Sequence, residues 1–264
     1  MRIALSLEYD GSAFHGWQSQ PGGETVQDVL ETALSAVAGE PIKTFAAGRT
    51  DAGVHALAQV VHFDSGVDRP LSAWIRGTNA HLPATVAVRW AQPVSEAFHA
   101  RFSACARRYR YVLFNSAVRP ALLSGKVGWC HDPLDAVAMA SGTRYLLGEH
   151  DFSAFRAAEC QAKTPVKTLY SAAVSRQGDY LLFDFHANAF LHHMVRNIVG
   201  ALVYVGKGAH PPEWIDALLA NRDRTRAAPT FAAAGLYFAG ADYPHEWRIP
   251  EEARIIAPFS TLPV

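Results

Sequence analysis

Apolar side chains alternate with polar ones at the start of the chain and then recur at helical spacing. Every second residue from Ile3 to Tyr9 is apolar, a period of two that predicts a strand. After a glycine-rich loop, Thr25 and Asp28 stand three residues apart in the arrangement of a capping box. The apolar residues at 26, 29, 30, 33, 34 and 37 then follow helical spacing. The chain is therefore expected to open with a strand and a helix.

The same patterns continue through the first hundred residues. Strands are expected at 42–46, 59–64 and 85–90, and a second helix begins after Pro70. The first part of the chain thus predicts the order β-α-β-β-α-β.

The second part of the chain can be described in the same order. The expected elements are a strand over 108–115, a helix opened by Asp132 and Pro133, a hairpin of 167–174 and 180–187 turning at Gln177-Gly178-Asp179, an amphipathic helix over 191–203, and a closing strand over 236–239. A short helix over 214–219 and a tail from about residue 241 are additions to this pattern.

Two successive β-α-β-β-α-β units predict an α/β (α+β) protein made of two ferredoxin-like halves. We expect them to pack about a pseudo-twofold axis, with a central cleft where a ligand binds. The expected division is residues 1–102 and residues 103–264.

Composition narrows the class of protein. Half of the 264 residues are hydrophobic and 18% are charged, which excludes global disorder. The 24 basic and 24 acidic residues leave no net charge, so any attraction for a polyanion must come from local patches. No apolar run reaches bilayer length, and Glu8 and Asp10 interrupt any secretory signal, so a cytoplasmic protein without a membrane partner is expected.

The three cysteines have no metal-binding or disulfide spacing, so they are expected to be buried, reduced thiols. The phosphate-binding, dinucleotide, nucleophile-elbow and zinc-protease motifs GxxxxGK[ST], GxGxxG, GxSxG and HExxH do not occur in the sequence. Nucleotide hydrolysis, dinucleotide redox chemistry and serine hydrolysis are correspondingly disfavoured.

Residues 47–55, AGRTDAGVH, place polar side chains on a loop between Gly48 and Gly53. Glycines permit backbone angles that other residues resist, so the loop can present Asp51 in a tight conformation. A loop aspartate in isolation is more often an Asx-turn or a helix cap.

Residues 99–114, HARFSACARRYRYVLF, contain four arginines and no acidic residue, interleaved with Phe102, Tyr109 and Tyr111. Guanidinium groups neutralise phosphates and aromatic faces stack on unpaired bases, so this pattern indicates RNA. The alternative is an edge strand with solvated arginines. Residues 221–226, NRDRTR, form a second candidate phosphate-contacting loop, although Asp223 offsets part of its charge.

Arg196 lies inside an otherwise apolar helix pattern, so it must reach solvent at the helix rim or pair with a carboxylate. The adjacent His192 and His193 would point about 100° apart on a helix, a poor geometry for joint metal ligation. No metal site is expected there.

Three motifs together, EYDGSAFHGWQSQ (8–20), AGRTDAGVHA (47–56) and FSACARRYRY (102–111), resemble those of the tRNA pseudouridine synthases that modify the 3′ side of the anticodon stem-loop. The similarity continues through FHARF (98–102) and NAFLHHMVRNIVGAL (188–202) and spans most of the chain. It implies the pseudouridine synthase fold, a homodimer without cofactor or metal, and isomerisation of uridines 38, 39 and 40 of tRNA to pseudouridine.

The resemblance also assigns roles to individual residues. It implies that Asp51 is the catalytic aspartate and that Arg49 fills the space left by the displaced base. Tyr109 is similar to the residue that stacks on the target uracil, and Arg196 to the arginine that pairs with the aspartate. Cys105, within FSACARRY, is a departure from the expected pattern.

Further contacts to the RNA backbone are expected from the arginines that flank these motifs, namely Arg108, Arg110, Arg222 and Arg224. Two other hypotheses stay open from the sequence. One is a non-catalytic tRNA-binding module or chaperone on the same scaffold. The other is a metal-dependent hydrolase that uses His55, His62 and Asp64.

Overall fold

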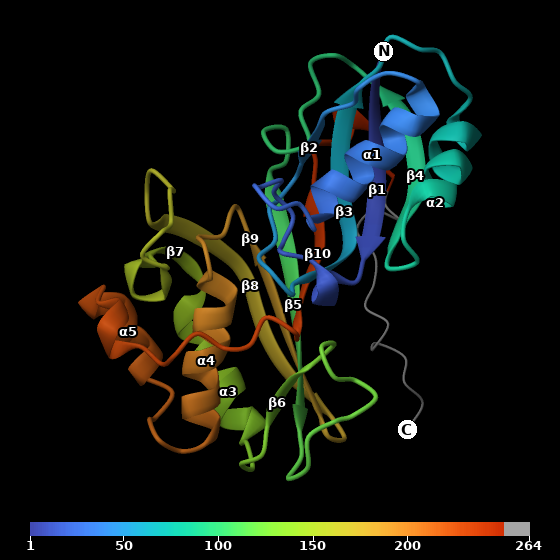
Figure 1. The fold of residues 1–264 in the computed structure, drawn as a ribbon. Coiled ribbons are helices and arrows are strands. Elements are labelled where there is room, and N and C mark those ends of the chain that lie inside the picture. Colours follow the sequence, from blue (N-terminus) through green and yellow to red (C-terminus); the bar gives the residue numbers. More distant parts are fainter. Residues whose placement is uncertain (251–264) are drawn as a thin grey trace. The chain divides into compact units, whose positions relative to one another are not determined.

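The computed structural model describes residues 1–250, which divide into two compact units (Figure 1). Unit 1 comprises residues 1–107 and 237–250, and unit 2 comprises residues 108–236. Each unit is mixed α/β and contains parallel as well as antiparallel strand pairs. The expected division at residue 102 placed the whole remainder of the chain in the second half, whereas residues 237–250 belong with the first.

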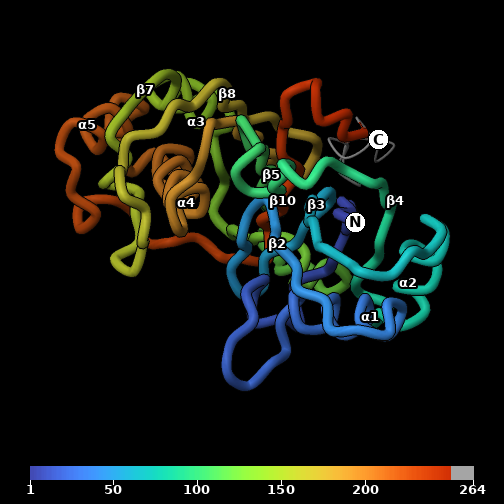
Figure 2. The backbone as a smooth tube through the Cα atoms, turned by 90° about the horizontal axis from the view of Figure 1, so that it is seen from above, coloured from blue at the N-terminus to red at the C-terminus, as the bar shows by residue number. Residues whose placement is uncertain are grey.

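Unit 1 is a sheet covered on one face by helices. Its elements are β1 (Arg2–Tyr9), α1 (Val26–Ala38), β2 (Thr44–Ala46), β3 (His55–Asp64), a π-helical turn (Ala73–Gly77), α2 (Thr78–His81), β4 (Val86–Val94) and β10 (Leu236–Asp242). The strand order is β4-β1-β3-β10, and β2 also pairs with β3. Seen from above, α1 and α2 lie side by side along the sheet (Figure 2). The predicted order of the first hundred residues is confirmed.

One edge of β3 is shared by two short partners. β2 pairs with it antiparallel at Phe63 and Val61, and β10 pairs with it in parallel at His55 and Ala56. The sequence pattern predicts that residues 236–239 complete the second half of the molecule. Residues 237–250 are instead part of unit 1, because β10 pairs with β3 at Tyr237 and Phe238.

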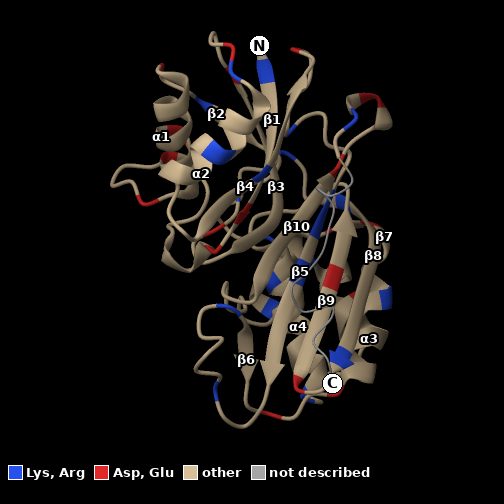
Figure 3. Cartoon of the chain, turned by 90° about the vertical axis from the view of Figure 1, so that its right-hand side faces the viewer, with Lys and Arg blue, Asp and Glu red and all other residues tan. Residues whose placement is uncertain are grey.

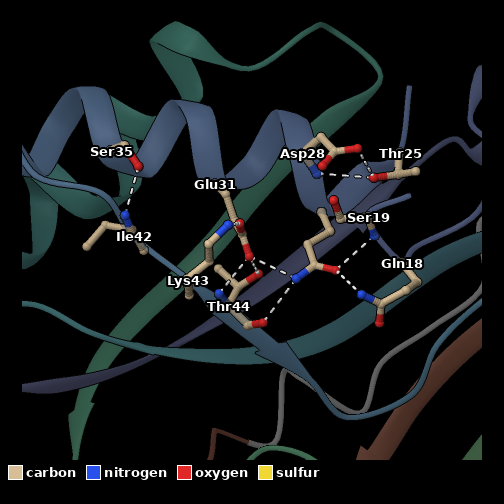
Figure 4. Close-up of polar contacts among 10 residues, drawn as sticks. Gln18, Ser19, Thr25, Asp28, Glu31, Ser35, Ile42, Lys43 and Thr44 are labelled. Atoms are coloured by element: carbon tan, nitrogen blue, oxygen red, sulfur yellow. Dashed lines mark hydrogen bonds and ion pairs between the residues drawn. The ribbon is translucent and has the colours of Figure 1, made fainter. Parts of the chain in front are cut away.

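Helix α1 is fixed at both ends and along its length. The Thr25 hydroxyl accepts a hydrogen bond from the backbone N–H of Asp28, and Gly39 ends the helix with a left-handed φ of 77°. The Glu31 carboxylate accepts hydrogen bonds from the backbone of Thr44 and from Lys43, each at 2.9 Å (Figure 4). The predicted cap is confirmed, and α1 is joined to β2 through Glu31.

Unit 2 is built around the β8–β9 hairpin. Its elements are β5 (Ala106–Asn115, entering from unit 1), β6 (Gly128–Cys130), α3 (Ala136–Thr143), β7 (Gly148–Asp151), β8 (Val166–Gln177), β9 (Tyr180–Ala187), α4 (Met194–Gly206) and α5 (Trp214–Asn221). The strand order is β5-β9-β8-β7, with β6 on β5. The predicted hairpin is confirmed and turns at Gly178, whose φ is 56°.

Two helices of unit 2 begin later than the sequence predicted. Asp135 rather than Asp132 caps α3, accepting hydrogen bonds from two backbone N–H groups, while the Asp132 carboxylate pairs with Lys207 at 2.6 Å. α4 starts at Met194 because His193 adopts a left-handed φ of 60°, so Leu191 precedes the helix. The short strands β6 and β7 were not predicted.

The described residues also test two expectations drawn from composition. Among the helices of residues 1–250, none combines the length and apolarity that a bilayer crossing requires. Cys130 and Cys160 are buried free thiols, as expected, whereas Cys105 is exposed. The Cys105 thiol donates to the carbonyl of Asp242 at 3.3 Å.

His62 is an uncharged histidine in the middle of unit 1. Its side chain is 1% exposed on β3, where Nδ1 accepts a hydrogen bond from the backbone N–H of Ala100 at 3.1 Å. Burial, with the nearby His99 and Arg2, lowers the pKa of His62 to about 4. The neutral ring is therefore the form that the folded protein favours.

We predict that unit 1 loses stability as the pH falls from about 6.5 to about 4. An unfolded His62 takes up a proton near its ordinary pKa, whereas the folded protein resists protonation until about pH 4, so stability present above pH 6.5 is lost through this window. Urea unfolding at several pH values should show that the free energy of unfolding falls less steeply with decreasing pH for His62→Asn than for the wild type. The difference in slope should be up to about 1.4 kcal/mol per pH unit. Parallel curves for the two proteins would contradict this.

Candidate functional site

Residues 48–54, here called the RTD loop, are closed at both ends by hydrogen bonds. At its start, the Gln59 side-chain amide donates to the carbonyl of Gly48 at 2.5 Å, and Ala47 donates to Val60 at 2.8 Å. At its end, the N–H of Val54 donates to the carbonyl of Asp51 at 3.1 Å, and Gly53 has a φ of 75°. The loop is thus a tight turn held by strand β3.

Thr50 anchors the middle of the RTD loop in the interior of unit 1. Its side chain is 6% exposed, and its hydroxyl lies 2.7 Å from the hydroxyl of Tyr9. Its carbonyl accepts a hydrogen bond from the N–H of Trp17 at 2.9 Å. Arg49 is exposed and Asp51 is half-buried. The buried threonine therefore leaves its two charged neighbours at the surface of unit 1.

Burial keeps Tyr9 neutral. It raises the pKa of Tyr9 to about 12, with hydrogen bonds to Thr50 and Gln59 acting in the opposite direction. A neutral phenol can donate to the threonine hydroxyl at any physiological pH. The anchor is therefore insensitive to pH in the range where an enzyme works.

The EYDGSAFHGWQSQ segment encloses the RTD loop at van der Waals distance. A Cβ atom on Gly11 would lie 1.9 Å from the carbonyl oxygen of Val54, and one on Gly16 would lie 2.7 Å from that of Thr50. The N–H of Gly53 also donates to Phe14 at 3.3 Å. The two glycines of this segment permit the close approach, which explains why both motifs belong to one arrangement.

His55 has a structural role at the end of the RTD loop. Its Nδ1 accepts a hydrogen bond from the backbone N–H of Gly11 at 3.0 Å, and its ring stacks on Tyr237 with centroids 4.6 Å apart. Burial, with Asp10, raises the pKa of Tyr237. The ring of His55 therefore joins β3, β10 and the segment after β1.

The metal-dependent hydrolase hypothesis is wrong. His55 and His62 lie seven positions apart on β3, which corresponds to about 23 Å along a strand. The Asp64 carboxylate accepts two hydrogen bonds from the guanidinium of Arg2, at 2.8 and 2.7 Å. These three residues therefore cannot ligate one ion.

Arg107 connects the RTD loop to residues 98–104. Its guanidinium donates to the carbonyls of Ala47 at 3.3 Å, Ala104 at 3.0 Å and Arg101 at 2.5 Å. The sequence pattern places this arginine among the possible phosphate contacts. The structure shows that it fixes two loops of unit 1 to each other.

In unit 2, Tyr109 lies half-buried on β5. Its ring meets Phe190 edge to face, with centroids 5.0 Å apart and an interplanar angle of 80°. Tyr111, two positions along the same strand, is fully buried, and its hydroxyl donates to the carbonyl of Ala232 at 2.9 Å. Phe190 supports Tyr109 and was not identified from the sequence as a site residue.

Arg196 lies in the first turn of α4 and is held by Phe231. Its Nε donates to the carbonyl of Phe231 at 2.8 Å, and its own carbonyl accepts from the N–H of Phe231 at 3.2 Å. The side chain is half-buried. The Nε contact orients the guanidinium, and no local sequence pattern could reveal a partner 35 residues away.

The segment from 228 to 235 that carries Phe231 lies close to α4 and β5. A Cβ atom on Gly200 would lie 2.4 Å from the carbonyl oxygen of Pro229, and one on Gly235 would lie 2.4 Å from that of Val112. The Thr230 hydroxyl donates to the Asn197 side chain at 2.7 Å. Gly200 in α4 and Gly235 before β10 therefore permit the close approach of the segment whose backbone orients Arg196.

The four arginines that were expected to contact the RNA backbone fall into two groups in the structure. Arg110 makes two hydrogen bonds to Asp184, at 2.6 and 2.9 Å. Figure 3 colours basic segments of β5 blue and an acidic segment of β9 red. Arg224 donates to Asn197 at 3.0 Å, and burial lowers its pKa. Both side chains stabilise unit 2. Arg108 and Arg222 are exposed, with Arg222 3.5 Å from Asp151.

The prediction that the side chains of His192 and His193 point about 100° apart on a helix is wrong. Both residues precede α4, and their ring centroids lie 4.0 Å apart rather than diverging as on a helix. The left-handed backbone of His193 produces this arrangement.

Comparison with known proteins accords with the motifs. Residues 5–103 and 143–244 match the family model described as tRNA pseudouridine synthase. The chain is 62% identical to "tRNA pseudouridine synthase A" of Dechloromonas aromatica, over 95% of this chain and 96% of that protein. It is 61% identical to the protein of the same name from Aromatoleum aromaticum, over 97% of each.

Among solved structures, "Crystal Structure of a Cbf5-Nop10-Gar1 Complex" aligns with a TM-score of 0.34 at 9% identity. The alignment covers 89% of this chain and about half (48%) of that chain. A likeness of this strength carries no argument about the fold. The family model and the relatives, by contrast, span most of the chain: it belongs to the tRNA pseudouridine synthase family.

Proposed function

We propose that this enzyme isomerises uridine to pseudouridine at positions 38, 39 and 40 of the tRNA anticodon stem-loop, with Asp51 as the catalytic residue. The observation that carries the proposal is the RTD loop, in which a buried Thr50 leaves Arg49 and Asp51 at the surface of unit 1. The family and its relatives named tRNA pseudouridine synthase A support the substrate.

The reaction sets the tasks of the side chains. The bond between N1 of the uracil and C1′ of the ribose breaks, the base turns, and a bond forms between C5 and C1′ as C5 loses a proton and N1 gains one. A target nucleotide must first leave the base stack, at a cost of a few kcal/mol. Arg49 fills the vacated space and Tyr109 stacks on the extruded uracil, which offsets part of that cost. The atoms balance without an external redox or group-transfer reagent.

Asp51 acts in its ionised form. The carboxylate attacks the ribose or the base, or removes a ribose proton, and each of these roles requires the negative charge. Arg196 provides the opposing positive charge, which favours the ionised form and orients the carboxylate. The hydrogen bond from Arg196 to Phe231 supports this role, because it fixes the guanidinium in unit 2.

The arrangement of strands in unit 1 supports a ferredoxin-like half. In unit 1, β3 lies between β1 and β2, which is the split β-α-β arrangement of that fold. We assign the enzyme to the cytoplasm, as a homodimer in which both subunits hold the tRNA. Arg108 and Arg222 are the exposed candidates for phosphate contacts, whereas the pairings of Arg110 and Arg224 favour structural roles.

The alternative function is a non-catalytic tRNA-binding module or chaperone. Binding alone does not require a carboxylate in a loop fixed by Tyr9, Trp17 and Gln59, because phosphate contacts depend on positive charge. The constrained RTD loop therefore favours the enzyme.

We predict that Asp51→Asn lowers kcat by at least about a thousandfold, as removal of a central catalytic group does in other enzymes. The amide keeps the size of the side chain and removes its charge. The measurement is tritium release from tRNA containing 5-tritiated uridine, with tRNA binding as the control. Normal turnover by the variant would exclude Asp51 as the catalytic residue, and binding without turnover in the wild type would support the chaperone alternative.

We predict that Tyr109→Leu lowers kcat/KM by roughly 5- to 150-fold, the equivalent of about 1–3 kcal/mol of lost stacking. Tyr109→Phe is the matched control, since it keeps the aromatic face and the contact with Phe190. It should retain most of the activity. Equal losses in the two variants would assign the effect to the hydroxyl, and an active Tyr109→Leu protein would remove the stacking role.

A further inference from the structure

Four aromatic rings in unit 1 form a continuous cluster that the proposed chemistry does not use. Phe102 lies 4.3 Å from His99 between ring centroids, and Phe45 lies 5.5 Å from His99 and 5.0 Å from His62. His62 is buried, whereas Phe102 is 76% exposed and Phe45 is 49% exposed. We call Phe45, His99 and Phe102 the aromatic platform.

A positive charge lies directly beside the platform. The guanidinium carbon of Arg101 is 5.7 Å from the centroid of the Phe102 ring, and Arg101 is exposed. Arg2 reaches the same region, donating to the carbonyl of Phe98 at 2.9 Å and pairing with Asp64. From His99 to Arg110 the sequence has no acidic residue. The exposed apolar face is therefore flanked by an exposed cation.

The platform is also held in a fixed conformation. The N–H of His99 donates to the Ser103 hydroxyl at 3.0 Å, and the N–H of Ser103 donates to the carbonyl of His99 at 2.8 Å. Nδ1 of His99 accepts from the N–H of Arg101 at 3.1 Å. Burial, with Arg2 and Arg101, lowers the pKa of His99, so the ring is neutral. A neutral, preformed aromatic face loses little conformational entropy when it binds a flat ligand.

Arg107 fixes the platform relative to the catalytic loop. Its guanidinium donates to Arg101 on one side and to Ala47, at the start of the RTD loop, on the other. Phe45 lies two residues before Ala47, on β2. The platform and the RTD loop are therefore held together within unit 1.

We propose that the aromatic platform binds an unpaired nucleobase of the tRNA, stacked on Phe102, while Arg101 contacts a neighbouring phosphate. Exposed aromatic rings beside arginines are the arrangement by which proteins bind single-stranded nucleotides. An interface with a second copy of the chain is the competing use of an exposed apolar ring, but it gives no function to Arg101. The inference rests on the proposed function, since it takes the bound polymer to be the substrate.

The test measures the affinity of the full-length protein for an unmodified tRNA transcript at several salt concentrations. Phe102→Ala should raise the Kd by at least about fivefold, corresponding to about 1 kcal/mol of stacking, and raise KM in parallel. Phe102→Trp should bind within about twofold of the wild type, because it keeps the aromatic face. Arg101→Gln should weaken binding and reduce the slope of log Kd against log salt by about one.

Val137→Ala is the matched control, since Val137 on α3 is also 76% exposed and apolar. It should leave the Kd unchanged. An unchanged Kd for Phe102→Ala, or an equal loss in Phe102→Trp, would overturn the proposal. A change in oligomeric state of Phe102→Ala, measured by light scattering, with unchanged affinity per protomer would assign the ring to an interface instead. A wild type that binds tRNA through Phe102 but forms no pseudouridine would refute the proposed function alone.

Discussion

The burial of Thr50 is the constraint on which the catalytic loop depends. One hydroxyl contact to Tyr9 and one backbone hydrogen bond from Trp17 hold this residue inside unit 1. Its neighbours Arg49 and Asp51 remain at the surface as a consequence. Because burial raises the pKa of Tyr9 to about 12, its phenol stays neutral and able to donate throughout the physiological pH range. The glycines of the first motif serve this anchor by allowing the backbone around Trp17 to approach the loop.

In unit 2, contacts with neighbouring residues likewise hold the proposed site residues in place. Tyr109 is supported by the edge of Phe190, and Arg196 is oriented by the carbonyl of Phe231. In both units the side chains that we propose for the reaction are half-buried or exposed, while their support comes from residues far along the chain. Substitutions of these supporting residues are therefore expected to affect turnover through orientation rather than through lost contacts with RNA.

The sequence predicted the elements better than their partners. Periodicity located α1, the β8–β9 hairpin and most strands, because those patterns depend on local burial. It could not predict that Tyr237 and Phe238 pair with β3, or that Asp132 pairs with Lys207 and leaves the cap of α3 to Asp135, since both depend on contacts distant in sequence. Motif resemblance named Asp51, Arg49, Tyr109 and Arg196. The sequence did not identify the supporting residues Gln59, Phe190 and Phe231, because each acts through contacts distant in sequence.

The most direct measurement of the central claim is single-turnover pseudouridine formation by Thr50→Val, which keeps the shape of the side chain and removes its hydroxyl. The account predicts a protein that is folded and binds tRNA, with its rate lowered by at least about tenfold, since a misplaced catalytic group is costly. Thr50→Ser, which keeps the hydroxyl, should recover most of that rate. A Thr50→Val enzyme as fast as the wild type would contradict the account, because the loop would then present Asp51 without its anchor.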